Sequence, residues 1–243
     1  MNITVLFDED TENANLLTGF GLSLLIGNNV IFDTGSDGDA LLHNLKVLNI
    51  VTDRINTIVL SHEHWDHIDG IFALLSVIKN PDIYICPGFS REFKKELIKA
   101  GAKFHLPGTV TKISRGIYTT GEIKGMYKGM VMPEQSLIVT QNGGRATLVC
   151  GCTHYNLVDS FAEIQKRIAA RLNSTVTIDF IIGGLHLRDK TNDMIQQFGR
   201  TLHEAGITGI APLHCSGSTG RKQLNILFPS GFYNLHTGST LAQ

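Results

Sequence analysis

Hydrophobic positions in the first hundred residues come in short runs and at helical intervals, and they predict alternating strands and helices. Runs of apolar and β-branched residues predict strands at residues 3–7, 22–26, 30–32, 57–60 and 83–85. Asn28-Asn29 is a hairpin turn signal between the second and the third of these strands. Helical spacing of apolar residues predicts helices at 41–48, 71–78 and 91–99.

The middle of the chain changes to short β segments with turn residues between them. Residues 109–120, 136–140 and 146–150 predict strands, and Asn142-Gly143-Gly144 predicts a hairpin turn. Residues 121–133 fit neither the helical nor the strand period. We expect a mobile loop there, either over an active site or as a plain surface excursion.

The last third of the chain alternates strictly between helices and strands. Its pattern predicts helices at 157–172 and 193–205, strands at 177–182 and 209–213, and a final strand around 232–235. Two β-rich parts, each flanked by helices, predict an α/β protein with two sheets packed face to face and helices outside. No linker or repeat interrupts the pattern, so we expect a single domain over residues 1–243.

Charge and composition narrow the classes of partner. The 243 residues include 21 basic and 22 acidic side chains without a basic block, which argues against nucleic-acid binding through phosphate neutralisation. No apolar run reaches membrane-spanning length, and acidic residues follow the first methionine too soon for a signal peptide. The four cysteines suggest no disulfide framework. We therefore expect a reduced, cytoplasmic protein that acts on a small molecule, with no nucleic-acid or membrane partner; the oligomeric state stays open.

The densest cluster of chemically active residues directly follows the predicted strand at 57–60. It reads His62-Glu63-His64-Trp65-Asp66-His67 and places three imidazoles and a carboxylate within six residues. A strand that ends in such a loop can direct several donors at one point. Imidazole and carboxylate together suit zinc, manganese or iron. The alternative is a solvated polar loop that happens to hold three histidines, and the spacing favours a metal site.

Three further histidines follow predicted strands in the second half of the chain. They are His154 after Gly151-Cys152, His186 after Gly183-Gly184, and His214, which precedes Cys215. An α/β protein builds its sites at the carboxyl ends of its strands, so the repetition indicates additional ligands. Small residues beside the histidines would permit close backbone approach to a metal or substrate, although ordinary turn chemistry would also place glycines there.

Asp33 also lies at a predicted strand end, and it has two equally good interpretations. It could orient a ligand imidazole through the second ring nitrogen, or it could belong to the N-cap region of a helix. We expect His43, His105 and His203 to be surface or core residues. His236 follows the last predicted strand and is expected to be peripheral, with a place in the site as the alternative.

These motifs together resemble the metallo-β-lactamase superfamily. The resemblance starts from Phe32-Asp33-Thr34-Gly35 and the His62–His67 pattern. Four further motifs resemble its dihydropterin-methyl ribofuranosylaminobenzene-phosphate synthase-like subgroup; they are Thr120-Gly121-Glu122-Ile123, Glu134-Gln135-Ser136-Leu137, Gly151-Cys152-Thr153-His154 with Gly183-Gly184-Leu185-His186-Leu187, and His214-Cys215-Ser216-Gly217. The resemblance covers essentially the whole chain. It implies a four-layer αββα sandwich and a cytoplasmic metal-dependent enzyme.

The resemblance also implies a two-metal site. In the superfamily pattern, His62 and His64 hold one ion, while Asp66 and His67 help to hold a second. The expected cofactors are two divalent ions, zinc first, with manganese or iron as alternatives.

The chain departs from the superfamily pattern in its second half. No histidine lies near Glu134-Gln135, where the third motif would place one, and Cys152 or His154 stands where a bridging aspartate is usual. We therefore assign His154 to the first ion and His214 to the second. His186 could take either role or contact the substrate. Cys152 and Cys215 are further candidates for ligands.

Three functions fit this set of residues. The first is a hydrolase of a small phosphorylated or ester-like substrate that uses metal-bound hydroxide, with Asp66 orienting the nucleophile and His186 stabilising developing charge. The second is a synthase that joins a dihydropterin-methyl group to a ribofuranosylaminobenzene phosphate with release of diphosphate. The third is a non-catalytic or redox-linked metal-binding module, because Cys152 and Cys215 lie near the ligands.

Overall fold

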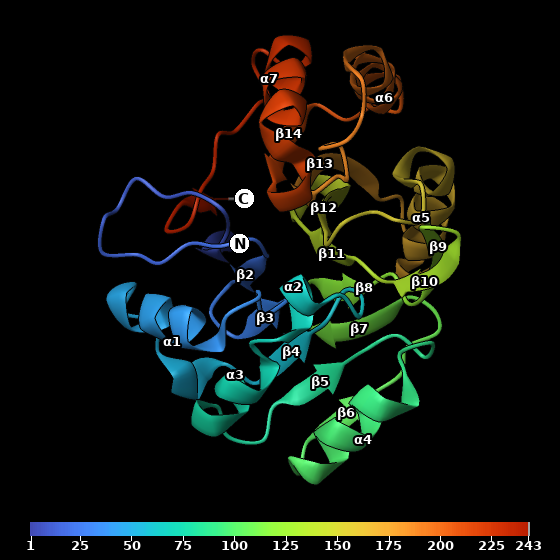
Figure 1. Ribbon diagram of the computed structural model, residues 1–243. Helices are drawn as coiled ribbons and strands as arrows, with labels where there is room; N and C mark the ends of the chain where they lie inside the picture. Colours follow the sequence, from blue (N-terminus) through green and yellow to red (C-terminus); the bar gives the residue numbers. More distant parts are fainter. Residues whose placement is uncertain (243) are drawn as a thin grey trace. The chain divides into compact units, whose positions relative to one another are not determined.

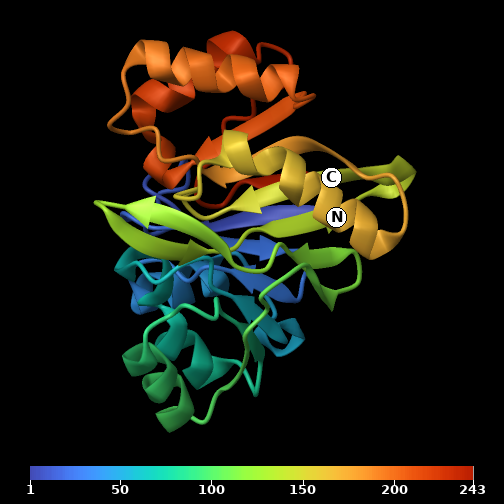
Figure 2. The same ribbon diagram turned by 90° about the vertical axis from the view of Figure 1, so that its right-hand side faces the viewer.

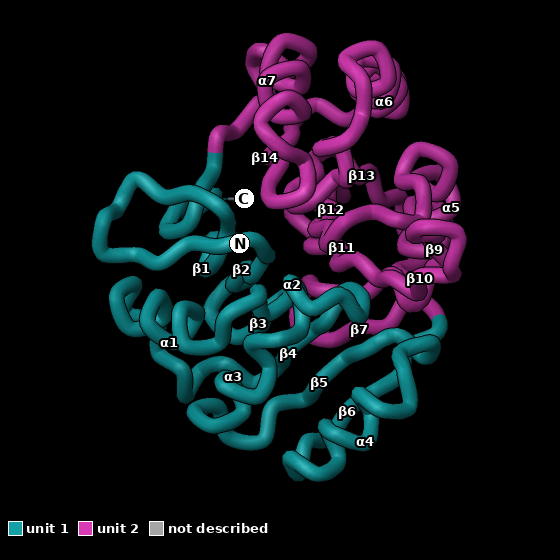
Figure 3. The backbone as a smooth tube through the Cα atoms, in the orientation of Figure 1, with its two compact units in different colours: residues 1–108, 235–243 teal, residues 109–234 magenta. Residues whose placement is uncertain are grey.

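A computed structural model describes residues 1–242, and the chain forms two compact units (Figures 1 and 3). Unit 1 consists of residues 1–108 and the C-terminal residues from 235 on, and unit 2 consists of residues 109–234. Each unit has its own sheet, helices and buried apolar cluster. The expectation of a single domain stays a prediction.

Unit 1 contains a seven-stranded sheet in the order β15-β1-β2-β3-β4-β5-β6. Its strands are β1 (Asn2–Phe7), β2 (Ser23–Ile26), β3 (Val30–Phe32), β4 (Thr57–Val59), β5 (Asp82–Tyr84), β6 (Lys103–His105) and β15 (Thr240–Ala242). The pairs from β15 to β3 are antiparallel, and those from β3 to β6 are parallel. Because β3 and β4 run in parallel, the residues that follow them, including Asp33 and Ser61, emerge at the same edge.

Four helices accompany this sheet: α1 (Gly38–Val47), α2 (Trp65–Ile68), α3 (Ile71–Val77) and α4 (Arg91–Lys99). Apolar side chains of α1, α3 and α4, such as Leu41, Leu74 and Leu97, form one buried cluster with strand residues such as Ile58 and Ile83. α1, α3 and α4 therefore cover one face of the sheet (Figure 1). The periodic leucines that predicted a helix over 41–48 thus form its buried stripe.

Unit 2 contains a six-stranded sheet in the order β14-β13-β12-β11-β8-β7. Its strands are β7 (Thr111–Ser114), β8 (Ile117–Thr119), β11 (Leu137–Thr140), β12 (Arg145–Cys150), β13 (Thr177–Gly184) and β14 (Gly209–Leu213). β12, β13 and β14 are parallel neighbours, so their carboxyl ends share an edge. The helices are α5 (Leu157–Leu172), α6 (Asn192–Glu204) and α7 (Gly217–Leu227), of which α6 and α7 lie side by side (Figures 1 and 2).

The prediction of a mobile loop over 121–133 is wrong. The segment forms a separate antiparallel ribbon of β9 (Ile123–Tyr127) and β10 (Met130–Glu134). Lys128 and Gly129, at φ 48° and 80°, make the tight turn between the two strands. Apolar side chains such as Met126 and Met130 are exposed on this ribbon, so the alternation that marks a half-buried strand is missing.

The predicted final strand is also misplaced. Phe232 makes only an isolated bridge to Ile210, and the last strand is β15, which pairs with β1. No hydrophobic pattern predicted β15 or β6, because each has three residues and includes polar ones. The longest helix, α5, has 16 residues, and none of the helices within residues 1–242 combines the length and apolar character needed to cross a membrane.

Candidate metal centre

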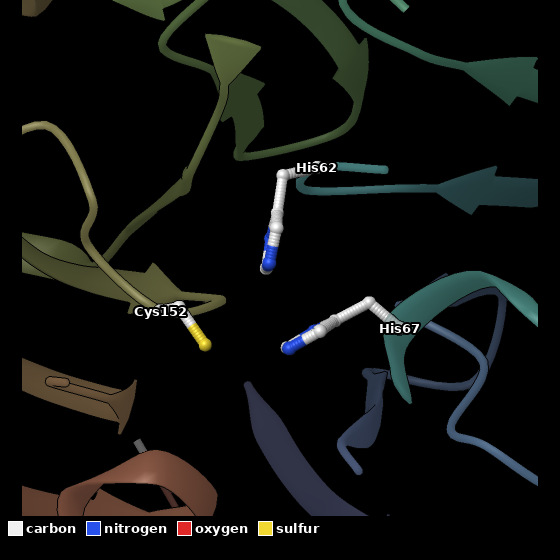
Figure 4. Close-up of side chains that lie close together, drawn as sticks. All are labelled: His62, His67 and Cys152. Atoms are coloured by element: carbon white, nitrogen blue, oxygen red, sulfur yellow. The ribbon is translucent and has the colours of Figure 1, made fainter. Parts of the chain in front are cut away.

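The predicted ligands of unit 1 lie on the loop after β4 and on the short helix α2. His62 and His67 are fully buried, and their ring centroids are 4.2 Å apart. Figure 4 shows these two rings directed toward one another. His62 Nε2 lies 3.0 Å from His64 Nδ1, and His67 Nε2 lies 3.7 Å from an Asp66 carboxylate oxygen. All four donor side chains that the sequence predicted in this loop are therefore gathered.

The second ring nitrogens of two of these histidines are tied to buried polar groups. His67 Nδ1 is 2.7 Å from Asp33 Oδ2, and His62 Nδ1 is 2.8 Å from Ser61 Oγ. The Ser61 amide and hydroxyl also donate to Asp33, at 2.6 and 2.7 Å. Such contacts fix the orientation of an imidazole and direct its other nitrogen toward a metal.

Asp33 is therefore placed where it could orient His67. It is not the cap of α1, because the N-cap of that helix is Asp37, which accepts the Ala40 N–H at 3.0 Å. Burial raises the pKa of Asp33 above its ordinary value, although His67 and Ser61 act in the opposite direction. Its role in metal binding stays a prediction.

Two contacts outside the predicted set hold the loop in place. The Glu63 carboxylate accepts the amide of Ser90 at 2.5 Å and also the Ser90 hydroxyl, which links the loop to the N-cap of α4. The carbonyl of His67 accepts the amide and the hydroxyl of Thr34, at 2.8 and 2.9 Å. The segment after β3 therefore supports both the ring and the backbone of His67.

Unit 2 presents its candidate donors after three parallel strands. Cys152 and His154 follow β12, His186 follows β13, and His214 and Cys215 follow β14. Thr153, His186 and His214 have left-handed backbones, with φ of 63°, 49° and 50°. Non-glycine residues in this region cost about 1–3 kcal/mol each, and they concentrate at functional sites. The three strand ends are thus strained where the donors lie.

Positions 183 and 184 require glycine for a steric reason, but not because of the expected close approach to a metal or substrate. A Cβ at Gly183 would lie 2.0 Å from the Cys150 carbonyl oxygen, and one at Gly184 would lie 2.1 Å from the Gly151 oxygen. The backbone of the neighbouring strand end, rather than a bound metal or substrate, is what approaches so closely.

The donors of unit 2 form two overlapping groups. The ligand atoms of Cys152, His154 and His186 lie within 4.8 Å of one another, and the same holds for Cys152, His214 and Cys215. Nδ1 of His186 is buried and makes no hydrogen bond to the part of the chain that the structure describes. Burial raises the pKa of Cys215, but contacts with Cys152, His186 and His214 outweigh this and hold that pKa well below its usual range. Such buried nitrogen and sulfur donors fit a transition-metal ion.

Glu134 is a candidate site residue that the sequence did not single out. Its fully buried carboxylate accepts the amides of Cys152, Thr153 and His154 at 2.7–2.8 Å and lies 3.0 Å from His154 Nδ1. Burial acts to raise the pKa of Glu134, but these hydrogen bonds hold it below its ordinary value. A signal was present, because Glu134 stands where the superfamily pattern has a ligand histidine.

A cavity of about 370 Å³ lies beside His154 and His186, entirely within unit 2. Its walls are mostly apolar, and Lys190 supplies a positive charge. The lining residues are Met126, Thr153, His154, Asn156, Leu157, Leu185, His186, Leu187, Lys190, Met194 and Phe198.

The other histidines have ordinary contacts. His43 Nε2 lies 2.8 Å from the Asn15 carbonyl oxygen, and His105 Nε2 lies 2.8 Å from Asp82. The ring of His203 lies 5.7 Å from that of Phe228 at an interplanar angle of 33°, and His236 lies 3.8 Å from Glu12, which is exposed.

Comparison with known proteins agrees with this architecture. The chain is 26% identical to 7,8-dihydropterin-6-methyl-4-(β-D-ribofuranosyl)-aminobenzene-5′-phosphate synthase of Methanocaldococcus jannaschii, over 94% of this chain and 92% of that protein. Among solved structures, a metal-dependent hydrolase of the beta-lactamase superfamily has a TM-score of 0.78 and 23% identity, over 100% of this chain and 99% of that one. Human tRNase Z, short form, has a TM-score of 0.62 and 14% identity over the same shares of the chains.

These structural matches confirm the predicted fold class, an α/β protein with the metallo-β-lactamase fold. At such low identity they carry no information on substrate. The sequence profile described as the metallo-beta-lactamase superfamily matches residues 17–172, which is more than half of the chain. The chain therefore belongs to the metallo-beta-lactamase superfamily.

Proposed function

We propose that this protein is a metal-dependent hydrolase of a small, phosphorylated or ester-like molecule. It uses two divalent ions, zinc first, with manganese or iron as alternatives. The proposed ligands are His62, His64, Asp66 and His67 in unit 1 and His154 and His214 in unit 2. The observation that carries the proposal is the anchoring in the unit 1 loop, where His67 Nδ1 is held by Asp33 and His62 Nδ1 by Ser61. A solvated polar loop would need no buried partners for its rings.

When bound, the ions would lower the pKa of a water molecule and polarise an oxygen of the substrate. The residues of the chain would orient the ligand rings and stabilise charge that develops on the substrate. Asp33 and Ser61 set the imidazole rings of unit 1, and Glu134 sets the ring of His154. His186, which lines the cavity, would stabilise charge that develops on a phosphoryl or carbonyl oxygen. Asp66 would both bind metal and orient the nucleophile.

The cavity of unit 2 supports a small substrate. At about 370 Å³ it lies in the size range of pockets for small molecules, and Lys190 would favour an anionic group. The nearly balanced charge of the chain, with 21 basic and 22 acidic residues, supports the absence of a nucleic-acid partner. A cytoplasmic location and the absence of a membrane partner belong to the same proposal.

A second candidate function is favoured by the curated relative. That protein of Methanocaldococcus jannaschii is named as a synthase and matches nearly the whole chain at 26% identity. The corresponding reaction here would join a dihydropterin-methyl group to a ribofuranosylaminobenzene phosphate and release diphosphate. Metal ions would then stabilise the departing diphosphate, and no attacking water would be needed.

One experiment separates the two candidates. The zinc-, manganese- or iron-loaded protein is screened against phosphomonoesters, phosphodiesters, lactones and a dihydropterin-methyl diphosphate, the last with and without the ribofuranosylaminobenzene phosphate. We expect hydrolysis of at least one ester that the His62→Ala variant does not catalyse. Condensation without ester hydrolysis would establish the synthase, and the absence of both reactions would overturn the proposal of an enzyme.

A further inference from the structure

Two of the four cysteines lie among histidines at the strand ends of unit 2. The sulfur atoms of Cys152 and Cys215 and a ring nitrogen of His214 lie within 4.8 Å of one another. All three residues are buried, with 2–5% of their surface exposed. Cys150, the last residue of β12, has a different setting: its sulfur lies 3.9 Å from the hydroxyl of Tyr155 in the apolar cluster.

The backbone around Cys215 leaves space for its sulfur and donates a hydrogen bond to it. The amide of His186 donates to Cys215 Sγ at 3.2 Å. A Cβ at position 184 would lie 2.7 Å from the same sulfur, so only glycine leaves this space clear. The amides of Leu187 and Arg188 donate to the Cys215 carbonyl at 3.0 and 3.1 Å and fix the residue itself. An amide donor and a cleared volume suit a sulfur atom that carries negative charge.

Buried cysteines most often behave as small apolar side chains, and Cys150 fits that description. Cys215 does not, because the His186 amide donates to its sulfur and a ring nitrogen of His214 lies within 4.8 Å of it. A disulfide between Cys152 and Cys215 is the other arrangement that such proximity permits. Metal binding accounts for the ring nitrogen of His214 within 4.8 Å of both sulfurs, a proximity that a disulfide does not require.

We propose that Cys152, His214 and Cys215 together form a soft-donor site, so that the ion bound to His214 has two thiolate ligands. The two cysteines bind as thiolates, with release of any proton that they still carry and with no change of oxidation state. Two sulfur ligands favour zinc, cobalt or cadmium over magnesium or manganese at this ion. This inference rests on the proposed function only in taking His214 as a ligand, and it concerns metal binding rather than turnover.

The test uses cobalt(II) as the probe on the full-length protein. Thiolate ligands give cobalt(II) an intense ligand-to-metal charge-transfer absorption in the near ultraviolet, which imidazole and carboxylate ligands do not. We expect this band in the cobalt-loaded protein, a loss of about half of it in Cys152→Ser and in Cys215→Ser, and its absence in the double variant. The matched control Cys150→Ser should keep the full band.

Three results would overturn the inference. They are cobalt loading without the band, a band that persists in the double variant, and a Cys152–Cys215 disulfide found by mass analysis of the unreduced protein. Because a serine variant could fail to fold, the chemical shift of bound ¹¹³Cd in the unmodified protein gives the number of sulfur ligands independently. Ester hydrolysis by cobalt-loaded protein that lacks the band would leave the proposed function standing without this site. A full band without any turnover would leave the site standing without the proposed function.

Discussion

The two units gather their candidate metal donors in opposite ways. In unit 1 the side chains of His62, His64, Asp66 and His67 come from six consecutive residues on one loop and one turn of helix. In unit 2 the donors span residues 152–215 and come together only because β12, β13 and β14 are parallel neighbours. The first set is a local feature of the sequence, whereas the second is a product of topology.

The means of support differ as well. In unit 1, side chains from other segments hold the rings, as Asp33 does for His67. In unit 2, the backbone carries much of the constraint, with left-handed residues at His186 and His214. A substitution that removes one anchor in unit 1 should therefore disturb one ring, while a change in the strand ends of unit 2 should disturb several donors together.

The buried carboxylates illustrate the contrast. Asp33 accepts one backbone amide, one hydroxyl and one ring N–H, and burial raises its pKa. Glu134 accepts three backbone amides and faces one ring, and its pKa is lowered despite equal burial. Burial acts to raise the pKa of Glu134, but the hydrogen bond and charge of His154, together with the backbone amides of Cys152 and Thr153, lower it.

The largest effect is expected from removal of a ligand in unit 1. His64→Ala should reduce bound metal and lower activity by at least about 100-fold, since even partners outside the ligand shell contribute 10- to 100-fold. Elemental analysis of the purified protein measures the metal. His105→Ala, which removes a ring that contacts Asp82, is the control and should keep full metal content. Unchanged metal in His64→Ala would show that the ligand assignment is wrong.

Removal of an anchoring carboxylate should have the next largest effect. Asp33→Asn should weaken metal binding by about 10- to 100-fold, because His67 loses the acceptor that sets its orientation. Metal affinity is measured by competition with a chelator. Asp37→Ala serves as the control: it removes the cap of α1 and should cost about 1 kcal/mol of stability while leaving affinity unchanged. Equal losses of affinity in both variants would mean that Asp33 acts only through folding.

Glu134→Gln is the counterpart in unit 2. The glutamine keeps one oxygen for the backbone amides, but it lacks the charge that faces His154 Nδ1. We expect a 10- to 100-fold weaker affinity for the ion assigned to His154, while the ion assigned to His214 keeps its affinity. Titration with cobalt(II), followed by its absorption, separates the two ions. Equal loss of both ions would contradict the assignment of His154 and His214 to different ions.

A smaller effect, on stability, is expected from a substitution in the ribbon of β9 and β10. A Cβ at Gly125 would lie 2.7 Å from the backbone of His154, and the Met126 amide donates to the His154 carbonyl at 3.0 Å. Gly125→Ala should destabilise the protein by about 1–3 kcal/mol and increase amide exchange in β9. Gly108→Ala, where the added Cβ meets nothing within 4 Å, should change neither quantity. Unchanged amide exchange in β9 of Gly125→Ala would show that the ribbon can shift to accept the added Cβ without loss of stability.

The smallest effect concerns acid stability of the metal-free protein. The folded pKa of Glu134 lies below its ordinary value of 4.5, so its charge stabilises the protein above that pH, and the benefit is lost as pH falls through the folded pKa. The folded pKa of Asp33 lies above 3.8, so its charge opposes folding above that pH, and protonation relieves the cost.

Urea unfolding at a series of pH values between 7 and 3 measures both effects. The stability difference between the protein and Glu134→Gln should shrink on acidification, by about 1 kcal/mol. The difference from Asp33→Asn should instead shift in favour of the unmodified protein. If both stability differences changed in the same direction on acidification, the opposite pKa shifts of Asp33 and Glu134 would be contradicted.

The sequence was sufficient to predict most helices and strands whose buried apolar residues follow a regular pattern. Helices such as α4 (Arg91–Lys99) and α5 (Leu157–Leu172) and the strand β14 (Gly209–Leu213) were predicted to the residue, because each buries a continuous stripe or run of apolar side chains. The ribbon at 123–134 was not predicted, since apolar residues such as Met126 are exposed on it and the alternation of apolar and polar residues is missing.

By itself, the sequence determined the candidate ligand loop and the superfamily, since His62 to His67 are neighbours in the chain and need no fold to bring them together. Only the tertiary structure decided which residues support them. The pairing of β3 with β4 brings Asp33 to Ser61 and His67, and the position of β10 brings Glu134 to the backbone of residues 152–154. A carboxylate becomes an anchor through the amides and rings that surround it, and these come from distant segments that a local pattern does not contain.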